Sequence, residues 1–318
     1  MTPLLEVRDL RMYYTGRRGD VRAVDGVSFS VAGGGRALGI VGESGSGKSS
    51  LAAAIMRMLP GNVSHFEGEV LLEGQEVSRL PEHVFHREIR WRRIAWVPQG
   101  AMNAFNPVIR VGEQIIEPLL VDGHVDRGAA RARAEALLEQ VGLPPEIYQR
   151  YPHELSGGMK QRAMIASALI MSPSLVLMDE PTSALDVSVQ AQIMNLLKRL
   201  KCELQIAIVF ITHDIAVASD VCDDMAVMYA GEMVELGSAE QVLLTPAHPY
   251  TQMLLASIPR LRASEMPQFI PGAPPDLQEP PPGCRFHPRC PHAMARCRES
   301  PPPAFSPRPG QWARCWLR

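Results

Sequence analysis

GIVGESGSGKSS, residues 39–50, is the stretch that decides the fold of this 318-residue chain. It ends an apolar, strand-like run with a glycine-rich loop, and the apolar helical run LAAAIMRML follows at residues 51–59. Strand, loop and helix in this order form the context of a phosphate-binding P-loop. Glycines let backbone N–H groups surround phosphate oxygens, and the helix N-terminus adds a positive dipole. The alternative interpretation is a glycine-rich turn with a purely structural role.

The side chains of this loop indicate a nucleoside triphosphate bound with Mg²⁺. Lys48 is placed to reach the terminal phosphates, and the Ser49 hydroxyl is placed to ligate the metal ion. The predicted nucleotide-binding residues of the loop are Gly42, Ser44, Gly45, Ser46, Gly47, Lys48, Ser49 and Ser50.

A pair of carboxylates follows a second apolar run, LVLMDE at residues 175–180. Asp179, at the end of a buried strand, is predicted to hold Mg²⁺, and Glu180 is predicted to polarise a water for attack on the γ-phosphate. Taken alone, two such carboxylates could equally cap the next helix. Together with a P-loop they favour a catalytic role.

The rest of the chain alternates between strand-like and helical patterns. Strand-like runs occupy residues 5–10, 23–31, 37–42 and 206–212, whereas RGAARARAEALLEQVGL at residues 127–143 is helical. Strands that alternate with helices predict a mainly parallel sheet covered on both faces. Beyond Pro259, where 15 of the 28 prolines lie, we expect a domain boundary and no continuation of the sheet.

Charge and hydropathy exclude several classes of protein. The net charge of −2 provides no global field that would attract nucleic acid or anionic lipid. No window approaches the roughly 18 to 20 apolar residues that a membrane-spanning helix needs, and no secretory leader is evident at the N-terminus. We therefore expect the chain to lie in the cytosol.

A second phosphate-seeking motif decides the family. HELSGGMKQR, residues 153–162, places Ser156, Gly157 and Gly158 before a helical run, which predicts a second helix N-terminus suited to phosphate. One chain needs two such sites only if the second serves another nucleotide. With this motif the sequence resembles the ATP-binding subunits of ABC transporters, over essentially the whole chain. The resemblance implies two subunits facing head to tail, with each ATP between the P-loop of one and the LSGG signature of the other.

The resemblance also implies a fold and further site residues. The fold is an α/β P-loop NTPase of ABC type, with a mainly parallel core sheet, a small antiparallel β subdomain, a helical subdomain at about residues 100–168 and a proline-rich C-terminal extension. Residues 1–258 are the expected ATP-binding domain and residues 259–318 the extension. The further site residues are Gln99 of the Q-loop as a catalytic residue and Mg²⁺ ligand, Asp186 of the D-loop (Ser183 to Asp186), His213 as the switch histidine, and Tyr14 stacked on adenine.

Other proteins with LSGG-type signatures act on DNA, chromosomes or ribosomes. The chain has no room between Lys48 and Ser156 for a long coiled coil, carries one cassette and shows no strongly basic face. We therefore expect no nucleic-acid partner, and a soluble nucleic-acid- or ribosome-linked ATPase is the alternative of a different class.

The C-terminal part of the sequence indicates which branch of the family the chain resembles. AHPYTQMLLASIP at residues 247–259, followed by PGCRFHPRCPHAMARC, resembles the extension of the ABC importers for dipeptides, oligopeptides and nickel. The resemblance implies a second ABC ATPase subunit, expected to be a paralogue, two membrane-spanning permease subunits, an extracytoplasmic solute-binding protein, and a position at the cytoplasmic face of the membrane. Nickel, glutathione or an oligosaccharide remain alternative cargoes to peptides. The Q-loop segment QGAMNAFNP at residues 99–107 lacks the Asp-Pro found in many relatives, which leaves cargo and partner open.

Four cysteines of the extension predict a metal site. Cys284, Cys290, Cys297 and Cys315 are separated by five, six and seventeen residues, unlike the short gaps of zinc knuckles. Such irregular spacing suits a 4Fe-4S cluster, which some members of this branch carry. Seven arginines against the single acid Glu299 in residues 284–318 are expected to offset the charge of the cluster. Structural zinc, unligated thiols, and a solvated or lipid-facing arginine patch are the alternatives.

Overall fold

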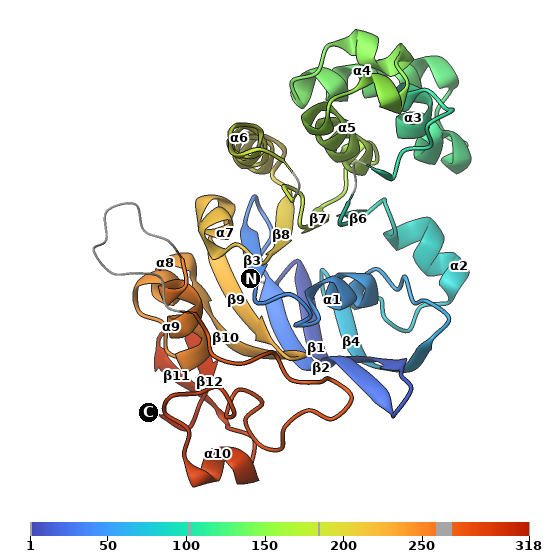
Figure 1. Cartoon of the computed structure of the whole chain (residues 1–318). Helices are drawn as coiled ribbons and strands as arrows, with labels where there is room; N and C mark the ends of the chain where they lie inside the picture. The colour runs from blue at the N-terminus through green and yellow to red at the C-terminus, as the bar shows by residue number, and fades with distance from the viewer. Residues whose placement is uncertain (1, 101–102, 184, 259–268, 318) are drawn as a thin grey trace. The chain divides into compact units, whose positions relative to one another are not determined.

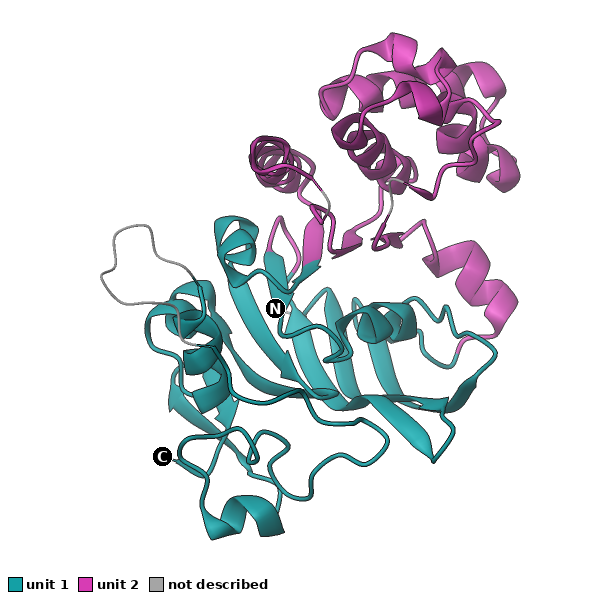
Figure 2. Cartoon of the chain, viewed as in Figure 1, with its two compact units in different colours: residues 1–32, 37–79, 210–318 teal, residues 33–36, 80–209 magenta. Residues whose placement is uncertain are grey.

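The computed structural model describes residues 2–100, 103–183, 185–258 and 269–317. The chain divides into two compact units, which Figure 2 shows in different colours. Unit 1 comprises residues 1–32, 37–79 and 210–318, and unit 2 comprises residues 33–36 and 80–209. The predicted domain boundary at Pro259 lies outside the described residues.

Unit 1 contains an antiparallel sheet near the N-terminus (Figure 1). Alternation of apolar and polar residues along β1 buries Leu5 and Val7, and after an irregularity between Val7 and Leu10 it buries Leu10 and Met12. The strands lie in the order β2-β1-β4-β5, with the bounds β1 Leu5–Thr15, β2 Asp20–Val31, β4 Val63–Leu72 and β5 Gln75–Glu76.

The second sheet of unit 1 has the order β11-β12-β10-β9-β3-β8. β3 and β9 are parallel, whereas β9 with β10, β10 with β12, and β11 with β12 are antiparallel. Every residue of β3 and β8 is buried, so their sequences read as continuous apolar runs. The bounds are β3 Ala37–Val41, β8 Ala207–Thr212, β9 Asp224–Tyr229, β10 Glu232–Ser238, β11 Ala304–Arg308 and β12 Gln311–Arg314.

The proline-rich extension contributes the strands β11 and β12 to this sheet. The expectation that the extension would not continue the sheet was therefore wrong. β12 pairs with β10, and β11 pairs with β12 at the end of the strand order. Pro307 lies in β11, where an edge strand tolerates a residue without a backbone donor. Composition predicted the loops of the extension but concealed the hairpin.

The described helices of unit 1 are short, and several begin at a residue whose side chain caps the helix. Ser238 and Gln241 form a capping box at α8, and the Asp214 carboxylate accepts hydrogen bonds at the start of α7. The bounds are α1 Lys48–Ile55, α7 Ile215–Val221, α8 Ala239–Leu244, α9 Pro249–Ala256 and α10 Ala295–Glu299.

Unit 2 combines the end of the parallel sheet with helices. β6 and β7 are parallel, and the strand order is β8-β7-β6, because β8 continues from this unit into unit 1. Asp126 caps α4, and α3 ends at the left-handed Gly123. The bounds are β6 Ile94–Val97, β7 Leu175–Asp179, α2 Glu82–Val84, α3 Val111–Asp122, α4 Arg127–Gln140, α5 Gly157–Leu169 and α6 Val187–Leu204, with the π-helix η1 Phe85–Ile89 and the 3₁₀ helices η3 Pro145–Gln149 and η4 Pro152–Glu154. None of the described helices is both long and apolar enough to cross a membrane.

Candidate functional site

The predicted P-loop connects the buried strand β3 to helix α1, which begins at Lys48. The Lys48 ammonium is buried beneath the loop and donates to the carbonyl oxygens of Gly42 and Glu43, at 2.8 Å each. Ser44, Gly45 and Ser49 are exposed. The loop therefore presents backbone and hydroxyl groups to solvent above a fixed positive charge.

Two glycines of the loop lie where a side chain cannot fit. A Cβ on Gly42 would lie 2.1 Å from the Met228 carbonyl oxygen, and a Cβ on Gly47 would lie 1.9 Å from the Ala23 carbonyl oxygen. Gly47 also has a φ of 102° and forms the N-terminal cap of α1. The loop thus packs backbone against backbone on its inner side, which suits a rigid cradle for phosphate.

The two neighbouring tyrosines of β1 have different partners. The Tyr13 hydroxyl donates to Asp25 at 2.6 Å, and burial and this hydrogen bond raise the pKa of Tyr13 to about 12. The Tyr14 hydroxyl lies 3.1 Å from the Ser50 hydroxyl in α1. Of the pair, Tyr14 is thus the one bonded to the helix that follows the P-loop, and its stacking on adenine stays a prediction.

In unit 2 the predicted carboxylates follow strand β7. Asp179 is buried at the end of this strand, and Glu180 follows with a φ of 48°, in the left-handed region. Gln99, just beyond β6, donates from Nε2 to the Glu180 Oε2 at 3.0 Å. The parallel strands β6 and β7 therefore bring Gln99 and Glu180 together at their carboxyl ends, as expected of neighbouring strands.

The predicted signature residues begin helix α5. Ser156 is its N-terminal cap and accepts from the Met159 N–H at 3.4 Å. A Cβ on Gly158 would lie 2.6 Å from Cγ1 of Val189. The first turn of α5 is thus a capped helix N-terminus with an exposed hydroxyl, which is the arrangement that favours an anion.

Asp186 and His213 each follow from local structure. Asp186 caps α6 by accepting from the Val189 N–H at 2.9 Å and from the Ser188 hydroxyl at 2.6 Å. These hydrogen bonds, with that of Ser188 the largest, hold the pKa of Asp186 below its usual value. His213 is exposed directly after β8. Their predicted roles at the nucleotide stay predictions, and Ala184 of the D-loop lies outside the described residues.

The four cysteines of the extension line one cavity, together with His248, Phe286 and other residues. The cavity measures about 10 Å³, which is about the room that one water needs. Burial raises the pKa of Cys284 to about 12 and also raises the pKa of Cys290 and Cys315. Within the described ranges, no group of three or more His, Cys, Asp or Glu side chains is arranged to hold a metal ion. The thiols fit a cluster in kind and number, but the predicted 4Fe-4S cluster is not supported by their arrangement.

Two of the arginines of the extension pair with carboxylates outside the extension. Arg285 forms ion pairs with Asp25 and with Glu232, at 3.1 Å for the latter. Arg289 forms an ion pair with Glu43 at 2.6 Å. Both arginines are 7% exposed, so the two most buried positive charges near the cysteines neutralise carboxylates of the unit 1 body.

Sequence reasoning missed two residues that contact the P-loop and a histidine that caps the helix carrying one of them. Tyr250 of α9 accepts from the Glu43 N–H at 2.8 Å, and Arg289 binds the Glu43 carboxylate. His248 caps α9 by accepting from the Tyr250 N–H at 3.0 Å, and burial lowers its pKa to about 4. Proline lies in the first turn of α9, but no local signal in the sequence reveals that Tyr250 contacts a loop 207 residues earlier.

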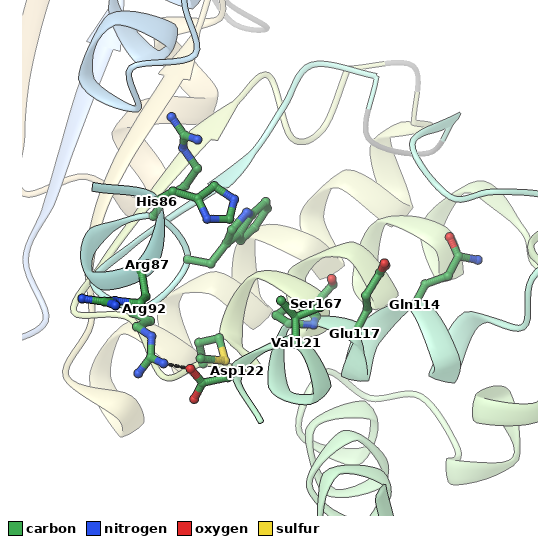
Figure 3. A pocket seen from close by; sticks show the side chains of 12 residues that line it. His86, Arg87, Arg92, Gln114, Glu117, Val121, Asp122 and Ser167 are labelled. Atoms are coloured by element: carbon green, nitrogen blue, oxygen red, sulfur yellow. Dashed lines mark ion pairs between the residues drawn. The ribbon is translucent and has the colours of Figure 1, made fainter. Parts of the chain in front are cut away.

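A cavity of about 530 Å³ lies within unit 2 (Figure 3). Its walls come from η1 and the turn after it, from α3, and from the end of α5. The Arg92 guanidinium pairs with Asp122 at its edge, and Val121 is 77% exposed beside it. The cavity therefore combines an ion-paired rim with apolar surface.

Comparisons with known proteins agree with this geometry. A family described as "ABC transporter" matches residues 24–183, and one described as "Oligopeptide/dipeptide transporter, C-terminal region" matches residues 234–297. The second match begins within β10, well before the predicted boundary at Pro259.

Several curated relatives match over nearly the whole chain. The oligopeptide transport ATP-binding protein OppD of Escherichia coli K12 is 46% identical over 302 residues, which cover 94% of this chain and 89% of the relative. OppD of Bacillus subtilis is 44% identical over 322 residues, which cover 100% and 89%. The dipeptide transport ATP-binding protein DppD of Caldanaerobacter subterraneus is 43% identical, with 95% and 93% covered.

Solved structures confirm the predicted fold class. The chain is similar to an ATP-binding cassette solved as a dimer in a post-hydrolysis state with ADP and Pi, at a TM-score of 0.65 and 29% identity, over 74% of this chain and 98% of the other. It is also similar to cbiO1 of Clostridium perfringens, part of an ABC transporter complex, at a TM-score of 0.64 and 26% identity, over 77% and 92%.

Proposed function

This chain belongs to the ATP-binding subunits of ABC transporters, in the branch with an oligopeptide/dipeptide C-terminal region, and we propose that it hydrolyses ATP to power the import of short peptides. The P-loop carries this proposal, because its backbone cradle, buried Lys48 and exposed Ser49 suit a triphosphate with Mg²⁺. The relatives named for oligopeptide and dipeptide transport support the cargo.

In the proposed reaction each site residue has a defined task. Lys48 and the loop amides bind phosphate oxygens, while Ser49, Gln99 and Asp179 would hold Mg²⁺, which withdraws charge from the phosphates when bound. Glu180 accepts a proton from the attacking water. The hydrogen bond from Gln99 to Glu180 supports this role, because it orients the carboxylate.

The remaining predicted residues complete the nucleotide site. The signature residues Ser156, Gly157 and Gly158 are proposed to bind the nucleotide held by a second subunit, through the N-terminus of α5. Asp186 and His213 are proposed to act where the two subunits meet.

A substitution of Glu180 tests the enzymatic proposal. Glu180→Gln should lower ATP turnover in the assembled transporter by roughly 10²- to 10⁴-fold, about 3 to 5 kcal/mol of barrier, with Mg-ATP binding retained. Glu203→Gln, an exposed carboxylate in the same unit, is the matched control and should leave turnover unchanged. Near-normal phosphate release by Glu180→Gln would assign the general base to another group.

The proposed assembly has a second ABC ATPase, a paralogue of this chain, two permease subunits and an extracytoplasmic solute-binding protein. In this assembly the chain lies at the cytoplasmic face of the membrane.

The cavity of Figure 3, with Val121 and the exposed Val108 and Ile109 nearby in sequence, supports a docking site for a cytoplasmic helix of a permease. Val121→Asp should prevent co-purification with the permeases, whereas Leu244→Asp, at an equally exposed apolar residue of unit 1, should not.

Uptake measurements separate the cargoes. Cells that lack this chain should lose uptake of labelled di- and oligopeptides, and should keep uptake of Ni²⁺, glutathione and oligosaccharides. Stimulation of the purified ATPase by DNA or RNA would instead favour the alternative of a nucleic-acid- or ribosome-linked enzyme.

A 4Fe-4S cluster at Cys284, Cys290, Cys297 and Cys315 is also part of the proposal. The number and chemistry of the thiols support it, since a 4Fe-4S cluster takes four cysteine ligands. Anaerobically purified protein should contain about four irons and four sulfides per chain. Cys290→Ser should remove most of this iron, and Cys202→Ser, at an exposed cysteine, should not. Iron-free protein with one bound zinc, or with none, would reject the cluster.

A further inference from the structure

Glu43 of the P-loop is held by the C-terminal extension. The Arg289 guanidinium donates from Nη1 to the Glu43 Oε2 at 2.6 Å and from Nη2 to Oε1 at 3.0 Å. This fork of two parallel, charge-assisted hydrogen bonds joins residues 246 positions apart. The Arg289 side chain is 5% exposed and the Glu43 side chain 25%, so little solvent screens the pair.

Arg289 is itself fixed in place. Its Nε donates to the Pro271 carbonyl at 2.8 Å, and Nη1 also approaches the Tyr229 hydroxyl at 3.3 Å. Tyr229 packs against Tyr250 and Phe286, with ring centroids 4.5 and 5.2 Å away. The guanidinium therefore has a single position, set by the extension and by the strand end beneath the P-loop.

The backbone of Glu43 is engaged as well. Its N–H donates to the Tyr250 hydroxyl at 2.8 Å, and its carbonyl oxygen accepts from Lys48 Nζ at 2.8 Å and from the Ser46 N–H at 3.2 Å. Glu43 is thus the residue through which the extension reaches the lysine that serves the phosphates.

The charge of Arg289 matters for a second reason. An unpaired Glu43 carboxylate would place a negative charge within the loop that receives a triphosphate, and like charges in a poorly solvated site repel strongly. Paired with Arg289, the carboxylate is neutralised without occupying the exposed face of the loop.

We propose that Arg289 is a positioning residue for ATP binding: through Glu43 it holds the P-loop in its binding conformation and cancels the charge of the Glu43 carboxylate. This inference rests on the proposed function. It assigns to the C-terminal extension a part in nucleotide affinity that is separate from any metal at the cysteines.

Mg-ATP titration of the purified full-length chain tests the proposal. Arg289→Ala should weaken Mg-ATP binding about tenfold, which corresponds to about 1.4 kcal/mol. In the assembled transporter the KM for ATP should rise by a similar factor, with kcat changed by less than about twofold. Arg289→Lys restores the charge without the fork and should recover part of the affinity. Arg298→Ala, at an exposed arginine of the same extension, is the matched control and should bind as the unmodified chain does.

A double variant separates positioning from general stability. Glu43→Gln combined with Arg289→Ala removes the carboxylate that Arg289 neutralises, so it should bind Mg-ATP more tightly than Arg289→Ala alone. A lower melting temperature with unchanged affinity in Arg289→Ala would overturn the proposal, and equal losses of affinity in the single and double variants would overturn its charge-cancelling part. Failure of the unmodified chain to bind Mg-ATP would instead refute the proposed function itself.

Discussion

Gly47 offers the sharpest test of the nucleotide loop. An alanine there would place its Cβ 1.9 Å from the Ala23 carbonyl oxygen and 2.9 Å from the Met228 Cε, at a φ of 102°. The methionine can rotate away, but the carbonyl belongs to the backbone of β2. Either the loop or the strand must therefore move by about 1 Å to reach a separation that carbon and oxygen tolerate.

The cost of Gly47→Ala has two parts. Forcing an L-residue into a left-handed conformation costs roughly 1–2 kcal/mol, and overpacking adds about 1–3 kcal/mol. A total of about 2–5 kcal/mol should lower the melting temperature by roughly 5–10 °C. If a displaced loop is favoured by about 3 kcal/mol, only about one molecule in a hundred binds correctly, and Mg-ATP affinity falls about 100-fold.

Gly45→Ala is the matched control. Gly45 also has a left-handed φ, of 78°, but a Cβ there meets nothing within 4 Å. Its melting temperature should fall by about 2–4 °C at most, since only backbone strain remains. Calorimetry and Mg-ATP titration of both variants give the answer. If the two variants show equal losses of melting temperature, the packing of Gly47 against β2 does not hold the loop.

Three further perturbations have defined outcomes. Tyr13→Phe removes the hydrogen bond that Tyr13 donates to Asp25. Burial raises the pKa of Asp25, but Tyr13 and Arg285 lower it by more, so the net shift is downward. The substitution should reduce the free energy of unfolding by about 1 kcal/mol at neutral pH. A carboxyl pKa that folding lowers contributes stability above the unfolded pKa and loses it as the pH falls through the folded pKa. Chemical denaturation should therefore show the Tyr13→Phe deficit shrinking as the pH falls below 3.8, the ordinary pKa of an aspartate. Asp186→Ala should lower the melting temperature because it removes the side-chain cap of α6, whereas Asp186→Asn should keep both the cap and the melting temperature. Gly158→Ala should displace the Val189 side chain. Expressed as free energies, its effect on ATP turnover in the assembled transporter should exceed its effect on stability.

Features encoded within a few residues could be predicted from the sequence. The P-loop, the carboxylates after β7 and the capped start of α5 each depend on a local alternation of apolar run, turn and helix. Once such local motifs fold, the parallel sheet brings the residues that follow neighbouring strands to the same edge of the sheet. The hydrogen bond between Gln99 and Glu180 follows from this rule, because the two residues come after adjacent parallel strands.

Contacts that depend on distant segments could not be predicted. The excess of arginine in the extension is evident from the sequence, but the partners of these arginines are not. A local excess of arginine does not reveal which carboxylates lie within reach in the folded chain. Arg285 pairs with Asp25 and Arg289 with Glu43, both across about 250 residues. The hairpin of β11 and β12 was missed for a related reason, since strand pairing at a sheet edge tolerates the prolines that composition reads as loop.

These distant contacts change the role of the C-terminal extension within unit 1. Its backbone also meets β2, where the Arg22 N–H donates to the Leu277 carbonyl at 3.0 Å, and Arg18 pairs with Asp276 at 2.7 Å. Exposed pairs of this kind contribute little energy, but buried, forked arginine contacts fix the position of what they hold. Because Arg289 immediately precedes Cys290, the segment that lines the cysteine cavity also carries the guanidinium that holds the P-loop. The extension therefore contacts the P-loop directly, and we expect a ligand bound by the four cysteines to stabilise the same segment.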